Sequence, residues 1–423
     1  MAQKPLAIQN ATIITGTGET IENGTVLFRD GKIQAVGKKV KVPVAARIID
    51  ATDHYVIPGM VEAHSSSGMS QANETNQIVP YVTVIDGIDP MNSYFRQARR
   101  NGITTVRISP GNSTMIGGQA AVIKTGGEFI DEMVVDGVAG IKISLRPVSG
   151  SRMAHLARLR KTLKDAKEKL EEKEEKEKKA EDKEKKDDDK KSAAKQDDDK
   201  KDEKKTEDKN KVSSPAALSE LDKAMNALLS GKNSAIIYCE KAMDVGQALR
   251  LIKEFDLKAS LVLGRDCHKA AKEIAASKLP VILDPTLVYW EEDPRTREEK
   301  KIVLPKIYRD AGVDFVFQTN RPGSSTIGSN YMWYQAATGV KYGMTEEEAL
   351  AAVTSLPAKF LNVDKFVGTI EKGKDADVVI LSGKPLDLNT WVETTIVGGE
   401  IVYEKEKDEQ LKRLLTGEEK DSE

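Results

Sequence analysis

The chain has 423 residues, with 65 lysines and arginines against 67 aspartates and glutamates. This length allows one large core or two ordinary ones, and the balanced charge indicates neither a nucleic-acid-binding nor a membrane-binding protein. Two cysteines are too few for a disulfide scaffold, and no apolar run approaches the ~18 residues of a membrane span. The start shows no basic segment followed by an apolar one, so we expect a cytoplasmic protein.

The two ends of the chain share a pattern of short strands separated by turns. Asp30-Gly31 indicates a hairpin, because its turn needs a positive φ at both central residues, and Gly398-Gly399 indicates a second hairpin. We therefore predict one small β-sandwich domain built from both ends, residues 1–57 with 363–405. A charged tail follows over 406–423.

Between these ends, over residues 58–362, continuous apolar strands alternate with helical stretches. Such strands, each followed by a helix, are typical of a parallel α/β structure. Eight strands can be counted, which favours a closed (β/α)8 barrel of the TIM type over an open sheet. The predicted strands are 55–64, 103–110, 119–127, 138–145, 234–240, 258–264, 279–285 and 313–320, and the predicted helices are 90–102, 242–255, 267–277, 297–312 and 327–343.

A charged insertion at about 160–212 interrupts this pattern. Residues 161–210 hold 19 lysines and 20 acidic residues. Glu and Lys at i,i+4 spacings favour a lone solvated helix in the first half, and the two "DDDKK" runs favour disorder in the second. We see no apolar face here and expect a solvated excursion from a barrel loop. A tether to a partner is the alternative.

The order of these pieces resembles the amidohydrolase superfamily. It is carried by "VIPGMVEAH" at 56–64, the barrel, and the return to strands with "GTIEKGKDADVVIL" at 368–381. Residues 85–127, whose "PGNSTMIGGQ" run ends at Gln119, are similar to the imidazolonepropionase-like branch. The resemblance implies a hydrolase of non-peptide carbon–nitrogen bonds in cyclic amides, acyl amino acids or dipeptides. It also implies one or two divalent metals, such as zinc, at the barrel mouth.

The resemblance indicates where the metal ligands should lie, and most of these positions carry other residues. The first strand of the family ends in His-x-His, which here is His64 and Ser66. The histidines of two later strands map to Tyr238–Glu240 and to Leu263, and the closing aspartate maps to Asn320. Leucine cannot bind a metal, and serine and asparagine are poor ligands, whereas catalytic zinc needs three protein ligands. We therefore expect no metal cofactor.

Two further positions complete the candidate pocket. Gln119 closes the signature run, and the carboxylate or modified lysine of the middle strand should fall where Arg146 and Pro147 stand. A substitute metal site formed by His268, Cys267, Asp266 and Glu240 is an alternative, because successive barrel loops are neighbours. Catalytic residues cannot be assigned from the sequence.

Three functions remain open. The first is a degraded amidohydrolase, or pseudoenzyme, that binds a small molecule at the barrel mouth as a homodimer or beside an intact relative. The second is a hydrolase with an unusual ligand set, and the third is a structural or interaction module that uses the charged insertion. Without the metal, the free energy needed to deprotonate water is roughly 12 kcal/mol higher. A lone general base lowers the barrier by only about 3–5 kcal/mol. The first hypothesis therefore ranks highest.

Overall fold

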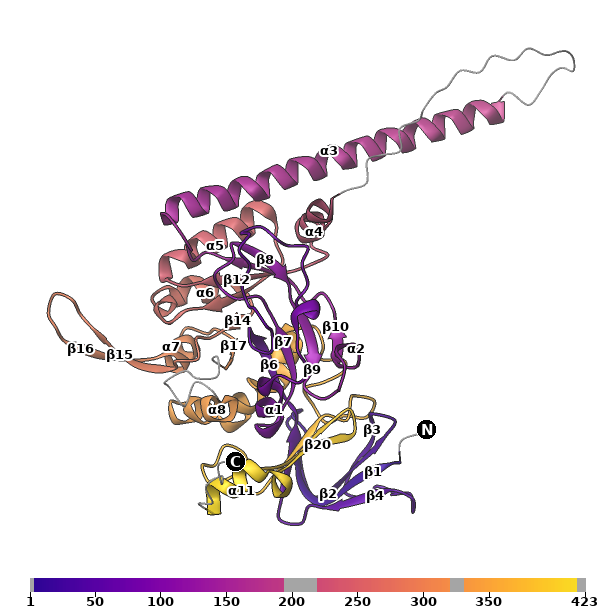
Figure 1. Ribbon diagram of the computed structural model, residues 1–423, viewed down its shortest axis with the longest axis vertical. Helices are drawn as coiled ribbons and strands as arrows, with labels where there is room; N and C mark the ends of the chain where they lie inside the picture. Colours follow the sequence, from indigo (N-terminus) through magenta and orange to yellow (C-terminus); the bar gives the residue numbers. More distant parts are fainter. Residues whose placement is uncertain (1–3, 194–218, 320–330, 417–423) are drawn as a thin grey trace, which may run out of the picture.

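The computed structural model describes residues 4–193, 219–319 and 331–416. A sheet built from both chain ends lies at one end of the molecule, and the long helix α3 (Arg152–Ala193) lies at the other (Figure 1). Strands and helices alternate between them, which confirms the predicted α/β class. Within the three described ranges, none of the helices combines the length and apolar character needed to cross a membrane.

Strands from both ends of the chain lie in one sheet, which we call the terminal sheet. Its order is β20-β19-β18-β5-β1-β2-β3, with β4 beside β1. The antiparallel pairing of β5 with β18 joins the two ends. The boundaries of a separate domain stay a prediction. The strands are β1 (Leu6–Ile14), β2 (Thr20–Arg29), β3 (Lys32–Gly37), β4 (Arg47–Asp50), β5 (Tyr55–Pro58), β18 (Val378–Leu381), β19 (Val392–Val397) and β20 (Glu400–Glu404).

Both predicted hairpins are confirmed, and the backbone shows why these residues form them. Asp30 and Gly31, between β2 and β3, have φ values of 50° and 74°. Gly398 and Gly399, between β19 and β20, have φ values of 57° and 80°. Two consecutive positive φ angles give the turn whose twist matches that of the flanking strands.

The middle of the chain forms two further sheets. One has the order β10-β9-β7-β6 and the other the order β17-β14-β13-β12-β11-β8. Pairs β6–β7, β11–β12, β12–β13, β13–β14 and β14–β17 are parallel, whereas β8, β9 and β10 pair antiparallel to their neighbours. The strands are β6 (Met60–Ser65), β7 (Ile103–Ile108), β8 (Ile116–Gln119), β9 (Ala121–Lys124), β10 (Val134–Asp136), β11 (Ile141–Ser144), β12 (Ala235–Cys239), β13 (Ala259–Leu263), β14 (Val281–Ile282) and β17 (Phe315–Val316).

One buried apolar cluster is shared by the two central sheets. It includes Val61 of β6 and Val122 of β9 from the first sheet, and Ile236 of β12, Val262 of β13 and Val316 of β17 from the second. Helices cover the outer faces of these sheets, as strands that are apolar on both faces require. The helices are α1 (Ser93–Arg100), α2 (Ile130–Met133), α4 (Glu220–Leu229), α5 (Ala242–Phe255), α6 (Ala271–Ser277), α7 (Leu304–Asp310), α8 (Met332–Lys341), α9 (Glu346–Ala351), α10 (Ser355–Phe360) and α11 (Glu409–Thr416), with 3-10 turns at Val84–Gly87, Arg265–Ala270 and Lys405–Lys407.

The expectation that the charged insertion has no packed face is wrong for its beginning. Helix α3 starts at Arg152, and its side chains at Leu159, Leu163 and Ala166 are buried in the main core. These residues recur at spacings of four and three, which places them on one face of the helix. Farther along, α3 extends beyond the body of the molecule (Figure 1). The second half of the insertion, residues 194–218, lies outside the described residues.

A second expectation needs correction at residues 297–312, where the sequence predicted one helix. Only Leu304–Asp310 is helical (α7), and Glu299–Val303 forms β16, which pairs with β15 (Val288–Glu292). This two-stranded arm projects from the molecule (Figure 1). Pro305 explains the boundary, because proline is favoured in the first turn of a helix and disfavoured inside one.

Candidate active site

A polar cavity of about 370 Å³ lies where strands of both central sheets end, and we call it the strand-end cavity. Because parallel strands present their carboxyl ends on the same side of a sheet, side chains distant in sequence meet there. The cavity is lined by His64, Ser65, Ser66, Ser67, Asn73, Gly111, Asn112, Ser113, Arg146, Tyr238, Val262, Leu263, Arg265, Asp284, Pro285, Thr286, Gln318 and Thr319.

His64, near the end of β6, makes two hydrogen bonds that determine its tautomer. The side-chain amide of Gln318 donates to the carbonyl of Leu283 over 2.7 Å, and this turns its Oε1 toward His64 Nδ1, also at 2.7 Å. An amide oxygen only accepts, so Nδ1 carries the ring proton and Nε2 keeps the lone pair. Lys142 Nζ, 2.7 Å from Nε2, donates to that lone pair.

Lys142 and Arg107 form a buried basic pair beside His64. Both side chains are almost or fully inaccessible, and Arg107 Nε and Nη2 find no hydrogen-bond partner among the described residues. Burial, followed by the charge of Arg107, holds the pKa of Lys142 well below its usual value. Burial lowers the pKa of Arg107 to about 10. Burial, and then the charges of Lys142 and Arg107, also keep the pKa of His64 well below 6.5, so this imidazole is neutral.

A series of ion pairs positions Arg146 at the cavity wall. Glu240 Oε1 forms an ion pair with Arg146 Nε at 3.2 Å, and Glu240 Oε2 accepts from Arg152 Nη2 at 3.1 Å. Arg152 Nη1 lies 2.5 Å from Asp244 Oδ1, and the other oxygen of Asp244 accepts from the backbone amides of Glu240 and Lys241 at the start of α5. Asp244 is fully buried. The network therefore ties α3, α5 and the end of β12 together behind the cavity.

The ends of β13 and β14, in the same sheet, bring a second guanidinium and a carboxyl group to the cavity. Burial raises the pKa of Asp284, although the backbone amide of Thr286 donates to this carboxylate at 2.8 Å. The guanidinium of Arg265 lies 5.3 Å from the centre of the Tyr289 ring. With Arg146 and Arg265 both lining the cavity, a ligand that presents carbonyl or carboxylate oxygens would find two guanidinium donors.

A second buried network lies beside the cavity. Glu62 Oε1 accepts from the backbone amide of Thr319 at 2.7 Å and from its hydroxyl at 2.6 Å, while Glu62 Oε2 accepts from Tyr94 at 2.7 Å. Glu62 is fully buried, and burial raises its pKa. These bonds connect β6 with the residues that follow β17, so their role is to hold the two central sheets together.

The structure brings four of the predicted site residues to the strand-end cavity: His64, Ser66, Tyr238 and Leu263. Glu240 is not part of the lining, but it holds Arg146, which is. Asn320 lies outside the described residues.

Gln119 lies away from the strand-end cavity. Its side-chain amide donates to the carbonyl of Pro80 at 3.1 Å, and it ends β8 opposite Ile141, at the start of β11. The antiparallel pairing of β8 with β11 explains this, because the end of β8 meets the amino end of β11 and not its carboxyl end.

Sequence reasoning missed Lys142 and Gln318, the two residues that contact His64. The side chain of the middle strand was expected at Arg146 and Pro147, but β11 ends at Ser144 and presents Lys142 instead. Lys142 thus lies on the strand for which the resemblance implies a carboxylate or a modified lysine. Arg146 and Pro147 follow the strand, and the register could have been found from the alternation of apolar residues around Lys142 in "GIKIS".

Comparison with known proteins agrees with this architecture. A model of the amidohydrolase family matches residues 216–402. The crystal structure of an amidohydrolase from Thermotoga maritima superposes with a TM-score of 0.76 at 26% identity, over 95% of this chain and 100% of that one. The chain belongs to the amidohydrolase superfamily.

Two curated proteins show how far this relationship extends in sequence. Amidohydrolase tasK of Hapsidospora irregularis is 25% identical over 93% of this chain and 43% of its own length. Imidazolonepropionase of Clostridium tetani is 29% identical over 44% of this chain and 44% of its own length. The chain therefore spans less than half the length of these curated relatives.

The metal centre of amidohydrolases needs several ligands, and His64 is the one histidine among the residues that line the strand-end cavity. The lone pair of His64 Nε2, which a metal would need, accepts a hydrogen bond from Lys142. In the described part of the chain, no group of three or more His, Cys, Asp and Glu side chains could hold a metal ion. That statement covers the alternative site at His268 as well. There, His268 Nδ1 contacts the hydroxyl of Tyr289 at 3.2 Å, and Cys267 Sγ donates to the carbonyl of Cys239.

Proposed function

We propose that this amidohydrolase-superfamily chain binds a small molecule with a carbon–nitrogen amide bond in the strand-end cavity, without a metal and with little or no hydrolysis. The observation that carries this proposal is the hydrogen bond from Lys142 Nζ to His64 Nε2. It occupies the imidazole atom that would either bind a metal or take a proton from water.

The free energy needed to deprotonate the attacking water supports the same proposal. A metal lowers the pKa of bound water from 15.7 to about 7, which amounts to roughly 12 kcal/mol. A general base typically contributes about 3–5 kcal/mol, and His64 is not free to act as one. The cavity is nevertheless large enough for a small ligand and offers the Arg146 and Arg265 guanidiniums to its oxygens.

The same proposal includes a closed (β/α)8 barrel. His64 and Glu62 of β6 bond to Gln318 and Thr319 after β17, and β6 and β17 are the outer strands of the two central sheets. The apolar cluster common to both sheets would then be the interior of the barrel.

Candidate ligands follow from the superfamily and from the relative named imidazolonepropionase: cyclic amides, N-acyl amino acids and dipeptides. Thermal-shift and calorimetric titrations of the full chain with these three classes should find one that binds once per chain. Ser66→Trp, which fills the cavity, should abolish that binding, and Lys161→Trp on an exposed part of α3 should not.

Hydrolysis is measured in the same samples, with and without added zinc or manganese. Elemental analysis should find far less than one equivalent of transition metal per chain, and added metal should not raise the melting temperature, because a ligand stabilises only what it binds. One tightly held metal per chain that is lost in His64→Ala, together with hydrolysis, would refute the proposal. It would favour the hydrolase with an unusual ligand set.

A second candidate rests on Asp284. A partly buried carboxyl with a raised pKa at a cavity wall is a common form of general acid or base. In that case, slow metal-independent hydrolysis should disappear in Asp284→Asn while ligand binding persists. Activity equal to that of the wild type in Asp284→Asn would exclude this role.

A further inference from the structure

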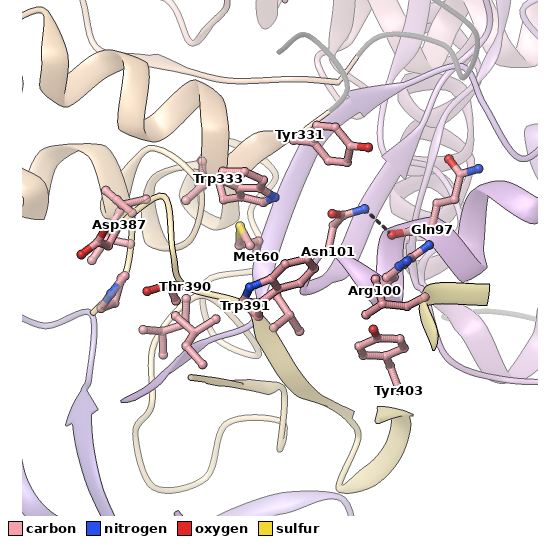
Figure 2. Close-up of a pocket in the computed structure, with 18 of the residues that line it drawn as sticks. Met60, Gln97, Arg100, Asn101, Tyr331, Trp333, Asp387, Thr390, Trp391 and Tyr403 are labelled. Atoms are coloured by element: carbon pink, nitrogen blue, oxygen red, sulfur yellow. Dashed lines mark hydrogen bonds between the residues drawn. The ribbon is translucent and has the colours of Figure 1, made fainter. Parts of the chain in front are cut away.

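A second cavity, of about 550 Å³, lies where the terminal sheet meets α1, α8, α9 and α11. We call it the junction cavity. Figure 2 shows Met60 between Trp333 and Trp391, with Asn101, Arg100 and Tyr403 on one side and Asp387 and Thr390 on the other. Its volume lies within the range of about 300–1,000 Å³ that is typical of ligand pockets, which occur preferentially between domains.

The junction cavity is separate from the strand-end cavity. Met60, which lines it, begins β6, whereas His64, which lines the strand-end cavity, stands near the end of that strand. Four residues of strand span about 13 Å. The two cavities share no lining residue, so a variant in one leaves the walls of the other intact.

The walls of the junction cavity are aromatic and apolar. Two of the three tryptophans in the chain, Trp333 and Trp391, line it together with Tyr331 and Tyr403, although aromatic residues make up only 5% of the sequence. Trp391 is 45% exposed, and Tyr331 and Trp333 pack together with ring centres 5.8 Å apart. Flat apolar faces of this kind favour a planar ring, which can stack on one indole and contact another by its edge.

One guanidinium beside these rings is unpaired among the described residues. Arg100 is paired with Asp408 at 3.0 Å, but Arg96, one turn earlier on α1, has no ion pair or hydrogen bond with the described residues. The charge of Arg96, after burial, lowers the pKa of Arg99 on the same helix. Lys405 Nζ lies 5.1 Å from the centre of the Trp391 ring, but it is paired with Glu393 at 2.7 Å. On the other side, Asp387 contributes a single carboxylate to the lining.

We propose that the junction cavity binds a small aromatic anion, a planar ring bearing a carboxylate, with the ring against Trp391 and Trp333 and the carboxylate toward Arg96. The ring buries the exposed indole face of Trp391. The carboxylate neutralises the unpaired guanidinium at the rim. This site is independent of the strand-end cavity and of its amide ligand.

Calorimetric titration of the full chain with three indoles of equal shape and different charge tests the site. Indole-3-acetate, the anion, should bind once per chain. Its neutral amide should bind about fivefold more weakly, because an exposed ion pair contributes up to that factor. Tryptamine, the cation, should bind more weakly still.

Two variants test the contributions of ring stacking and of charge to binding separately. Trp391→Ala should weaken indole-3-acetate about tenfold through loss of ring stacking. Arg96→Gln should remove the preference for the anion over the amide while leaving amide binding unchanged. Trp290→Ala is the matched control, because Trp290 is 62% exposed on the β15–β16 arm, and it should change nothing.

Several results would overturn the proposal. One is that the wild type shows no saturable binding of indole-3-acetate at millimolar concentration. Another is that Trp391→Ala binds indole-3-acetate as tightly as the wild type does. A third is that the wild type binds tryptamine more tightly than indole-3-acetate. Both Trp391 and Arg96 are on the surface, so melting temperatures within a few degrees of the wild type should show that their variants are folded. Arg96→Gln keeps the test decisive if Trp391→Ala does not fold, since its effect is on anion preference alone.

Discussion

Replacing Lys142 with methionine should change how the stability of the protein depends on pH. Lys142 is fully buried, and burial together with Arg107 holds its pKa well below 10.5. In the unfolded chain the same amine has its ordinary pKa and is protonated at neutral pH. Between the two pKa values the unfolded state therefore binds one more proton, and the folded state loses stability as the pH falls.

The size of this effect follows from linkage. Each pH unit that lies between the folded and unfolded pKa values changes the free energy of unfolding by about 1.4 kcal/mol. Methionine has a similar length and no titratable group, so Lys142→Met should lose this slope. The variant also loses the donor to His64 Nε2, which costs about 1–3 kcal/mol at every pH and does not alter the slope.

Urea unfolding followed by circular dichroism, for wild type and variant across pH 7 to 9, measures the difference. His64 titrates below this range because its pKa is lowered, and the buried Cys239 and Cys267, whose pKa values are raised, are common to both proteins. Lys161→Met, at an exposed position of α3, should run parallel to the wild type. If Lys142→Met also runs parallel, Lys142 is charged in the folded protein and the reasoning is refuted.

Three other perturbations have defined outcomes. Ser66→His alone should bring no metal to the elemental analysis, since two imidazoles fall short of three ligands, and one equivalent would contradict this. Leu163→Ala should lower the free energy of unfolding by about 2–5 kcal/mol, because this leucine of α3 is fully buried. Replacing 176–215 by a short Gly-Ser linker should change that free energy by about 1 kcal/mol or less in the same urea experiment. Asp244→Ala should cost about 1–3 kcal/mol, because the backbone amides of Glu240 and Lys241 lose their acceptor and Arg152 keeps only Glu240 as a carboxylate partner. No measurable loss would show that water replaces these bonds.

The sequence was sufficient for features that depend on neighbouring residues. The Asp30-Gly31 and Gly398-Gly399 turns, and the helix that begins at Ala242, follow from local backbone preference and periodicity. Local patterns failed where tertiary packing competed with them. The predicted helix at 297–312 pairs as a strand in its first part, because a cross-strand partner at β15 was invisible in the local sequence.

At the start of α3, the average over a long stretch of sequence hid residues that pack against the core. Its overall composition predicted a fully solvated helix, yet Leu159, Leu163 and Ala166 lie on one face against the core. Charge density over fifty residues masked three apolar positions in the first turns. A shorter window, restricted to the beginning of the insertion, would have shown the apolar stripe.

By itself, the sequence determined the superfamily, the alternation of strands and helices, and the replacement of the histidine after His64 by Ser66. Those depend on which residues follow one another. Only the tertiary structure decided what contacts His64, because Lys142 in β11 and Gln318 after β17 lie 78 and 254 positions away in the sequence. The register of each strand sets which side chain faces inward, and a shift of one residue reverses it. The identity of the group that occupies the His64 lone pair is therefore a property of the folded sheets.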